Sequence, residues 1–378
     1  MEVADWSGAR TALVHHWLVS NRGGEHVFEA MADLFPAADL FTLVYEPSQV
    51  PPSLKARQIR SSFLQKLPRA SRWYGYYLPL FSKATEQLDL AGYDLIISSD
   101  AATMKGVRAN PRATHICYCH TPMRYIWSGY ETYYRAAGRI PRLIFPAVRD
   151  HLRRWDFQAA QQVTRFVANS ENVRKRIRDY YGRESVVIYP PVDTNLFVMP
   201  PNPHSAQEFF LLVSQLVPYK RADLVVEAFN QCRRPLFVVG EGPERRKLEQ
   251  RAKSNVRFLG SQPRNAVVDA MQRCKGFVFA GEEDFGIVMA EAQSCGKPVV
   301  ALARGGAAEI VQPGVTGILF EEESVDSLLD GLARFDRTQF NPHEIRASAL
   351  RFNRQRFILQ FSEFVRNTVS SPKCLAAV

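Results

Sequence analysis

Several features that would classify a chain at once are missing from this sequence of 378 residues. No stretch approaches the roughly 18 consecutive apolar residues that a transmembrane helix needs. The first residues lack the basic start and apolar core of a secretory signal peptide, so we expect the protein in the cytoplasm. Glycine and proline, with 21 and 23 residues, are near average usage, which excludes collagen-like and low-complexity classes.

Cysteine is scarce. The six residues are Cys117, Cys119, Cys232, Cys274, Cys295 and Cys374, and none belongs to a C-x-x-C pair. This spacing fits neither a zinc site nor a disulfide framework, so we interpret the cysteines as free thiols in a reducing compartment.

Motifs for metal-bridged nucleotides and P-loop hydrolysis are missing as well. The sequence contains no D-x-D, no H-E-x-x-H and no G-x-x-x-x-G-K-[ST]. The Gly23–Gly24 pair is not a G-x-G-x-x-G sequence, which excludes a dinucleotide fingerprint there. We therefore expect no metal ion and no cofactor.

Positive charge is in excess, with 48 Lys and Arg against 38 Asp and Glu and a formal net charge of +10. Residues 135–178 hold eleven basic and three acidic side chains. Upstream, residues 72–81 mix tryptophan and tyrosine with cations. A solvated helix face and core packing would explain both segments, and attraction to an anionic surface, lipid or nucleic acid, is the alternative.

Short apolar runs alternate with amphipathic stretches, which is typical of buried parallel sheets with helices on both faces. We predict strands at Thr11–Trp17, Asp94–Ser98, His115–Cys119, Phe166–Ala168, Val186–Tyr189, Phe209–Val213, Leu236–Val239, Val256–Leu259, Gly276–Phe279 and Pro298–Ala301. The predicted helices are Gly24–Leu34, Asn172–Tyr181, Ala222–Gln231, Pro243–Ala252 and Val288–Ser294, with a final amphipathic pattern over Arg354–Val369.

The segment Val198–His204 interrupts this alternation, because its three prolines continue neither a strand nor a helix. We predict one doubly wound α/β domain over 1–200, a second over 201–353, and a helical segment 354–378 that crosses back to the first. Ligands bind such sheets beyond the carboxyl ends of the strands, so we expect the site in a central cleft that the two domains face.

Two of the predicted strand ends carry groups suited to a phosphorylated ligand. Glu283 and Glu291 flank Gly286, where a helix N-terminus would attract phosphate. Lys220 and Arg221 follow another strand and would meet a diphosphate. In isolation, acids at a helix start and exposed loop cations are equally ordinary features of a protein surface.

The other strand ends offer a glycine pair and a histidine. Gly23 and Gly24 would let an anion approach the backbone, although a Gly-Gly pair is usually only a turn. His120 ends a predicted strand and would hydrogen-bond a hydroxyl, although a lone histidine is most often structural.

Taken in order along the chain, these segments resemble a retaining GT-B glycosyltransferase of family four. The resemblance runs from Ala12 to about Phe364. It is carried by Gly23–Glu25, His115–Trp127, Ala168–Ser170, Tyr180–Arg183, Val187–Phe197, Tyr219–Arg221, Val239–Pro243, the E-x7-E segment Glu283–Glu291 and Gly305–Glu309.

The resemblance implies a role for each matched residue. Glu291 would hold the ribose hydroxyls of the donor nucleotide, and Glu283 and His120 would bind the donor sugar near the reacting carbon. Lys220 would neutralise the diphosphate, with Gly23 and Gly24 approaching it from the other domain. The remaining donor contacts would come from Arg221 and from the amides of Phe285, Gly286, Ile287 and Val288.

Two positions depart from the family pattern. Gln215 stands where the family usually places a diphosphate-binding arginine, and Met289 stands where related sequences commonly have proline. Arg221 is a candidate replacement for the missing cation.

The amino-acid sequences of the motifs are most similar to those of the mannosyltransferase-like branch that builds O-antigen and exopolysaccharide. The resemblance therefore implies a retaining, metal-independent hexosyltransferase that uses GDP-mannose, or alternatively a UDP-sugar. Its acceptor would be a polyprenyl-diphosphate-linked saccharide at the anionic inner face of the cytoplasmic membrane. A second hypothesis is a basic nucleic-acid-binding protein, but no recognised nucleic-acid-binding motif supports it. A third hypothesis is a nucleotide-sugar epimerase or phosphorylase of the same architecture.

Overall fold

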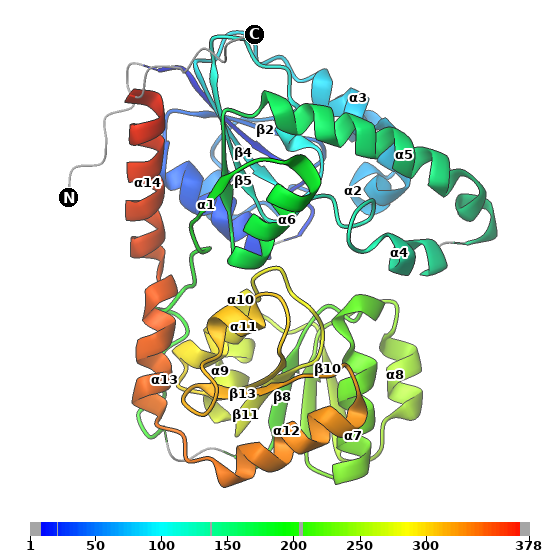
Figure 1. Cartoon of the computed structure of the whole chain (residues 1–378), viewed down its shortest axis with the longest axis vertical. Coiled ribbons are helices and arrows are strands. Elements are labelled where there is room, and N and C mark those ends of the chain that lie inside the picture. The colour runs from blue at the N-terminus through cyan, green and yellow to red at the C-terminus, as the bar shows by residue number, and fades with distance from the viewer. Residues whose placement is uncertain (1–8, 21, 137, 204–206, 371–378) are drawn as a thin grey trace. The chain divides into compact units, whose positions relative to one another are not determined.

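The computed structural model describes residues 9–20, 22–136, 138–203 and 207–370. The chain forms two compact units, an N-terminal unit that runs to Pro191 and resumes at Gln355, and a C-terminal unit that spans Val192–Arg354. Each unit is an α/β layer structure in which helices cover a parallel sheet, as Figure 1 shows. This arrangement confirms the predicted pair of doubly wound, Rossmann-like domains.

The N-terminal unit contains a seven-stranded sheet in the order β3-β2-β1-β4-β5-β6-β7. Its strands are β1 (Thr11–His15), β2 (Asp39–Thr42), β3 (Ile59–Ser61), β4 (Leu95–Asp100), β5 (Thr114–Cys119), β6 (Arg165–Ala168) and β7 (Ser185–Val187). Its helices are α1 (Gly23–Leu34), α2 (Ala70–Trp73), α3 (Phe81–Glu86), α4 (Tyr130–Ala136), α5 (Arg139–Gln162), α6 (Glu171–Tyr181) and α14 (Arg354–Ser370).

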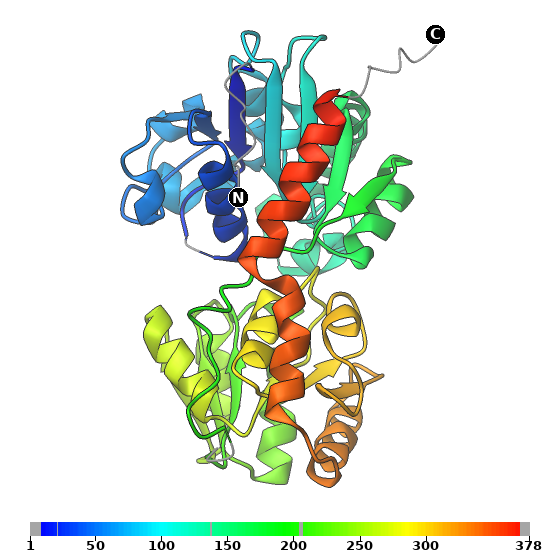
Figure 2. The same cartoon turned by 90° about the vertical axis from the view of Figure 1, so that its left-hand side faces the viewer.

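Side-chain alternation divides the core of this unit between the faces of the sheet. Leu13, Ile97 and Ile116 point to the face that α1 and α14 cover, where Phe357 and Phe361 of α14 are buried. Figure 2 shows α14 lying along this sheet. Ala12 and Ile96 point to the opposite face, which α3 covers, while α5 and α6 pack against β5 and β6.

A buried charge cluster joins α5 to the sheet. Lys105 Nζ lies 2.9 Å from Asp100 of β4 and 2.6 Å from Asp156 of α5, and all three side chains are inaccessible to solvent. Although burial opposes it, the two carboxylates raise the pKa of Lys105 well above its ordinary value. Trp127 and Tyr181 each donate a hydrogen bond of 2.7 Å to Asp156.

The C-terminal unit contains a six-stranded sheet in the order β10-β9-β8-β11-β12-β13. Its strands are β8 (Phe210–Val213), β9 (Leu236–Val239), β10 (Val256–Gly260), β11 (Gly276–Phe279), β12 (Val299–Leu302) and β13 (Gly317–Phe320). Its helices are α7 (Ala222–Cys232), α8 (Arg245–Arg251), α9 (Arg264–Arg273), α10 (Ile287–Ser294), α11 (Ala307–Ile310), α12 (Val325–Arg337) and α13 (Pro342–Ala349).

The two units divide at Pro191, before the predicted joint at residue 200. The reason is that the chain after Pro191 already packs on the C-terminal unit. Val192 forms a β-bridge with Asn353, and Arg346 donates a hydrogen bond of 3.1 Å to the carbonyl of Phe197. His204, at the end of the proline-rich segment, lies outside the described residues.

All ten predicted strands correspond to strands of the structure, with shifted ends at several of them. The strands β2, β3 and β13 and the helices α2, α3, α4, α5, α9, α11, α12 and α13 were not among the predicted elements. The described cysteines Cys117, Cys119, Cys232, Cys274 and Cys295 are free thiols, and Cys374 lies outside the described residues.

Candidate active site

Apart from Gly23 and Gly24, the predicted donor-binding residues lie at the carboxyl edge of the C-terminal sheet. The order of this sheet reverses direction between β8 and β11, which are parallel neighbours. Lys220 lies in the short 3-10 helix Pro218–Lys220 that follows β8, and Glu283 follows β11. Ligands of doubly wound sheets bind at such a switch point, because the loops that leave it diverge to opposite faces.

Lys220 and Glu283 form an ion pair through Nζ and Oε1. Their side chains are only 16% and 19% exposed. The backbone of Glu283 is fixed from the next strand, because it forms a β-bridge with Gly305 and its carbonyl accepts a hydrogen bond of 2.9 Å from the amide of Gly306. A Cβ at Gly306 would lie 1.9 Å from the carbonyl oxygen of Phe285, so this close approach requires glycine.

Gly286 is the N-cap of α10 and has a φ of +96°. Glycine adopts this conformation without strain, and a Cβ here would also lie 2.2 Å from Cε of Met289. The turn aims the first amides of α10, those of Ile287 and Val288, outward from the helix N-terminus. Phe285 has a buried side chain that packs against Phe352, so its contribution to a ligand is its backbone.

Glu291 lies in α10 and is almost fully buried. Burial raises the pKa of its carboxyl to about 7, with Arg264 opposing this shift and Asp193 reinforcing it. Arg264 lies 3.4 Å from Glu291 and 3.8 Å from Asp193. The carboxyl of Glu291 is therefore poised between its neutral and ionised forms near neutral pH.

Arg221, the candidate replacement for the missing arginine at Gln215, is held by acidic neighbours. Its Nε lies 3.0 Å from Asp223, and a second guanidinium nitrogen is paired with Glu323. Glu323 is also 3.6 Å from Arg304. In this structure the charge of Arg221 is thus already neutralised by side chains of its own unit.

A second group of predicted residues gathers at the switch point of the N-terminal sheet, between β1 and β4. Gly23 and Gly24 begin α1, and Glu25 secures this turn by accepting a hydrogen bond of 2.8 Å from Ser20 and one of 3.1 Å from the amide of Arg22. A Cβ at Gly24 would lie 3.7 Å from His15 and 3.9 Å from Nε2 of His120. The glycine pair and His120 are therefore close neighbours.

Ser99, at the end of β4, bridges two histidines. Its hydroxyl lies 2.9 Å from Nδ1 of His15 and 2.8 Å from Nε2 of His120. Burial lowers the pKa of His15 well below its ordinary value, and the neighbouring His16 and His120 lower it further, so His15 is neutral. The bridge fixes the orientation of the His120 ring.

His15, His16, Ser99 and Arg264 were not among the predicted site residues. His15 and His16 fell inside the predicted strand Thr11–Trp17, whereas β1 ends at His15. A polar pair at the carboxyl end of a buried strand was a usable signal for His15 and His16. Ser99 becomes significant only once β4 is known to lie between β1 and β5.

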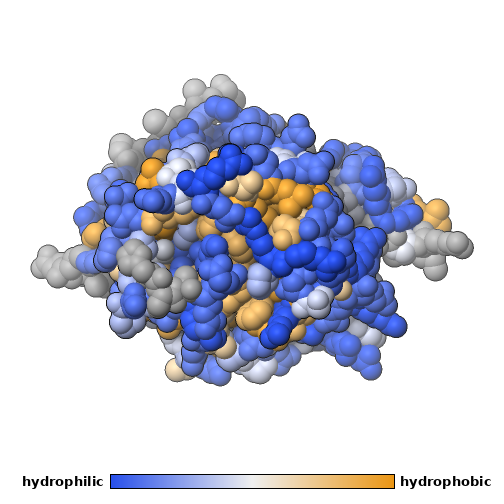
Figure 3. All heavy atoms as spheres, turned by 90° about the horizontal axis from the view of Figure 1, so that it is seen from below, coloured by the Kyte–Doolittle hydropathy of each residue, from blue (hydrophilic) through white to orange (hydrophobic). Residues whose placement is uncertain are grey.

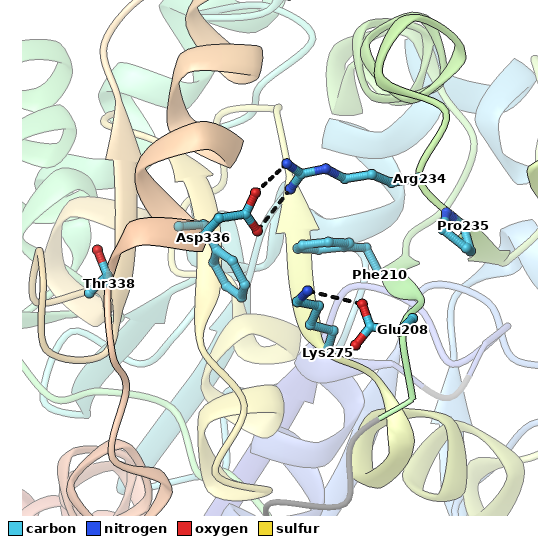
Figure 4. Close-up of a pocket in the computed structure, with 8 residues that line it drawn as sticks. Glu208, Phe210, Arg234, Pro235, Lys275, Asp336 and Thr338 are labelled. Carbon is cyan, nitrogen blue, oxygen red and sulfur yellow. Dashed lines mark hydrogen bonds and ion pairs between the residues drawn. The ribbon is translucent and has the colours of Figure 1, made fainter.

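Two pockets of the structure lie away from these residues. Seen from below, apolar residues gather in hollows between hydrophilic ones (Figure 3). A pocket of about 440 Å³ lies at the amino ends of the central C-terminal strands, where Arg234 pairs with Asp336 and Lys275 with Glu208 (Figure 4). A second, of about 980 Å³, adjoins the starts of β5 and β6. Neither is lined by a predicted site residue.

Two further properties concern only the part of the chain that the structure describes. No helix among these residues is both long and apolar enough to cross a lipid bilayer. The same residues include no group of three or more His, Cys, Asp or Glu side chains placed to hold a metal ion. Metal-independent catalysis stays a prediction.

Comparison with known families covers most of the chain in two segments. Residues 21–196 match the family Glycosyltransferase Family 4, and residues 199–350 match Glycosyl transferases group 1.

Curated relatives are similar over shorter stretches. An uncharacterized glycosyltransferase of Methanocaldococcus jannaschii is 28% identical over 208 residues, which are 53% of this chain and 54% of that protein. A GDP-mannose-dependent monoacylated alpha-(1-6)-phosphatidylinositol monomannoside mannosyltransferase of Corynebacterium glutamicum is 35% identical over 131 residues, 30% of this chain and 34% of that protein. The chain thus spans about half, or less, of the length of these relatives.

Solved structures extend the similarity of fold to nearly the whole chain. The Anabaena protein HepE, solved in complex with UDP and glucose, has a TM-score of 0.70 at 19% identity, over 95% of this chain and 99% of that one. The lipopolysaccharide outer core galactosyltransferase WaaB has a TM-score of 0.64 at 17% identity, over 94% and 99% of the two chains. Two segments of the chain thus match glycosyltransferase family models, and the chain has the GT-B fold.

Proposed function

We propose that this protein transfers a sugar from a nucleotide-diphosphate donor to a hydroxyl of a lipid-linked saccharide, with retention of configuration and without a metal ion. The observation that carries the proposal is the meeting of Lys220, Glu283 and the first turn of α10 at the switch point of the C-terminal sheet. A cation, a carboxylate and free amides together suit a phosphorylated sugar.

The donor roles are those that the family resemblance implies, and this chemistry suits them. Lys220 binds the diphosphate, and the amides of Gly286, Ile287 and Val288 bind phosphate and sugar oxygens. Glu283 accepts hydrogen bonds from the sugar, and Glu291 accepts them from the ribose hydroxyls. Arg221 contributes only if donor binding releases it from Asp223 or Glu323.

Sugar transfer requires charge stabilisation on the leaving group. The bond between the anomeric carbon and the phosphate oxygen breaks, a bond to the acceptor oxygen forms on the same face, and the acceptor proton passes to the departing phosphate. Lys220 and the α10 dipole stabilise the charge that develops on the diphosphate. In the N-terminal unit, His120 is proposed to hydrogen-bond the donor sugar and Gly23 and Gly24 to let the diphosphate approach α1.

GDP-mannose is the proposed donor, with a UDP-sugar as the alternative. The similarity to the GDP-mannose-dependent enzyme of Corynebacterium glutamicum supports the first choice. The complexes of Anabaena HepE with UDP and with UDP-glucose support the second. The proposed acceptor is a polyprenyl-diphosphate-linked saccharide, which the protein would meet at the inner face of the cytoplasmic membrane.

The test is nucleotide release from GDP-mannose and UDP-glucose, with and without a lipid-linked saccharide acceptor and with and without a chelator. We expect release that depends on acceptor and is unchanged by the chelator, with an α-linked product from either α-linked donor. Conversion of the donor without acceptor would instead indicate an epimerase. Loss of turnover with the chelator would contradict metal independence.

A further inference from the structure

The N-terminal unit contains a stretch without negative charge. Residues 47–85 hold seven lysines and arginines and no aspartate or glutamate. The acids that flank it have other partners than its cations: Glu46 accepts a hydrogen bond of 2.8 Å from Ser71, and Glu86 binds Arg108 and Trp155. Lys66, Arg69, Arg72 and Lys83 are exposed, and no ion pair with an acid of the described residues involves them.

The same stretch displays large apolar side chains to solvent. Tyr76 is 80% exposed, Trp73 38% and Leu80 38%. These residues belong to α2 and to the 3-10 helix Tyr74–Leu80 that follows it. In a 3-10 helix residues three apart share one face, so Trp73, Tyr76 and Pro79 form an outward stripe.

The inward side of this segment is well anchored, so its exposed residues are not a sign of poor packing. Tyr74, Tyr77 and Leu78 pack against the core cluster around Phe81, and the hydroxyl of Tyr77 donates a hydrogen bond of 2.8 Å to the carbonyl of Pro68. Arg69 lies over the ring of Trp73, with 4.8 Å between the guanidinium carbon and the ring centroid. A cation and an aromatic ring are therefore in contact at this exposed surface.

The basic residues of 135–178 differ from these cations, because several of them have partners within the N-terminal unit. Arg149 lies 2.8 Å from Asp150 and over the ring of Tyr130, and Arg174 lies 2.7 Å from Glu171. Arg153 stacks on Trp127 and donates a hydrogen bond to the carbonyl of Ile126. Much of the positive charge of this segment is thus used within the unit, although the sequence indicated it, together with residues 72–81, as a candidate anionic-surface contact.

We infer that the outer face formed by Lys66, Arg69, Arg72, Trp73, Tyr76, Leu80 and Lys83 docks on an anionic phospholipid bilayer. Tryptophan and tyrosine beside lysine and arginine suit the headgroup region, where rings enter the interface and cations meet lipid phosphates. The inference rests on the proposed function, since it assigns the surface that would bring the enzyme to its lipid-linked acceptor. A bilayer is favoured over nucleic acid because the same helical segment also exposes the apolar side chain of Leu80.

The experiment measures co-sedimentation of the full chain with phosphatidylcholine vesicles, with and without phosphatidylglycerol, in the absence of donor. Binding is expected only with phosphatidylglycerol and is expected to weaken with salt. The variant Arg69→Gln/Arg72→Gln/Lys83→Gln should lose about fivefold in partitioning per cation, on the order of 10² in all. The matched variant Arg154→Gln/Arg174→Gln/Lys175→Gln, with the same change of net charge, should bind nearly as the natural chain does.

A second measurement follows the tryptophan fluorescence in place of the effect of charge on binding. The emission of Trp73 should shift to the blue when vesicles are added, and Trp73→Phe should remove that shift. Absence of vesicle binding, equal losses in the two triple variants, or binding to duplex DNA in place of vesicles would each overturn the inference. Nucleotide binding in solution reports separately on the proposed function, so either proposal can fail while the other stands.

Discussion

Lys220 and Glu283 are ion-paired across the switch point of the C-terminal sheet. Each is the counterion of the other while no donor is bound. Under the proposed function, a diphosphate would compete with the Glu283 carboxylate for Lys220, and the released carboxylate would accept hydrogen bonds from the sugar. The pair would then couple recognition of the phosphate to recognition of the sugar.

Replacing Lys220 with alanine should reduce turnover without unfolding the protein. Loss of one preorganised charge contact to a leaving group lowers the rate by about 10²–10³. Glu283 is partly exposed and can be hydrated once its partner is gone. Lys275→Ala is the matched control, because Lys275 pairs with Glu208 at the other end of the sheet. Equal steady-state kinetics of the two variants would remove Lys220 from the site.

Glu291 should make donor affinity depend on pH. Because its pKa is raised to about 7, the ionised form that accepts ribose hydroxyls gains population as pH rises through this value. Nucleotide affinity should therefore increase between about pH 6 and about pH 8. Titration of Glu291→Gln, which cannot ionise, should give weaker binding with a flat profile, and a persistent pH dependence in this variant would contradict the role.

The same carboxyl should affect stability in the opposite direction. The folded protein retains a proton that the unfolded chain has released, so the free energy of unfolding falls as pH rises from the ordinary carboxyl range to about 7. The loss should be about 2–3 kcal/mol, and Glu291→Gln should abolish it. Denaturant titrations at about pH 5 and about pH 8 measure this difference. The same pH dependence of the free energy of unfolding in the natural protein and in Glu291→Gln would refute the prediction.

Gly24→Ala should separate folding from function. The added methyl would meet only ordinary contacts of 3.7–4.0 Å with His15 and His120, so the melting temperature should hardly change. The methyl would nevertheless occupy the space that the approach of a diphosphate needs, at a cost on the order of 10² in kcat/KM. Gly331→Ala, inside α12 with contacts no closer than 3.4 Å, is the control, and equal activity of the two variants would argue against this site.

Lys105→Met should severely destabilise the N-terminal unit. It leaves Asp100 and Asp156 buried without their shared cation, and breaking a buried pair costs about 3–5 kcal/mol. Lys247→Met, at a surface pair with Glu244, should change stability by less than about 0.5 kcal/mol. Similar unfolding free energies of the two variants would show that the cluster contributes little.

The α/β layer architecture could be predicted from the sequence because the central strands are continuous apolar runs. β1, β4 and β11 are buried at every residue, which leaves an unmistakable pattern. β3 was missed because it is a three-residue edge strand without a fully buried residue. The basic residues and Pro146 of α5 obscured its helical period, so residues 135–178 suggested a solvated helix face but gave no bounds for a helix.

The candidate site was partly predictable for a related reason. Lys220, Glu283 and Gly24 lie in the segments that come next after strands, so the strand pattern alone locates them at a carboxyl edge. Ser99 and His15 are 84 residues apart, and only the pairing of β1 with β4 brings them together. The neutralisation of Arg221 by Glu323, which is 102 residues away, was equally invisible in the sequence.

The most direct test of the account is a thermal-shift titration with GDP, UDP and ADP. A nucleotide that binds only the folded state at about 100 times its Kd stabilises it by about 2.7 kcal/mol. We predict that GDP or UDP raises the melting temperature of the natural protein and of Lys275→Ala, and that the rise is lost in Lys220→Ala and Glu291→Ala. An undiminished rise in the latter two variants, or no rise with any nucleotide, would contradict the assignment of the donor site.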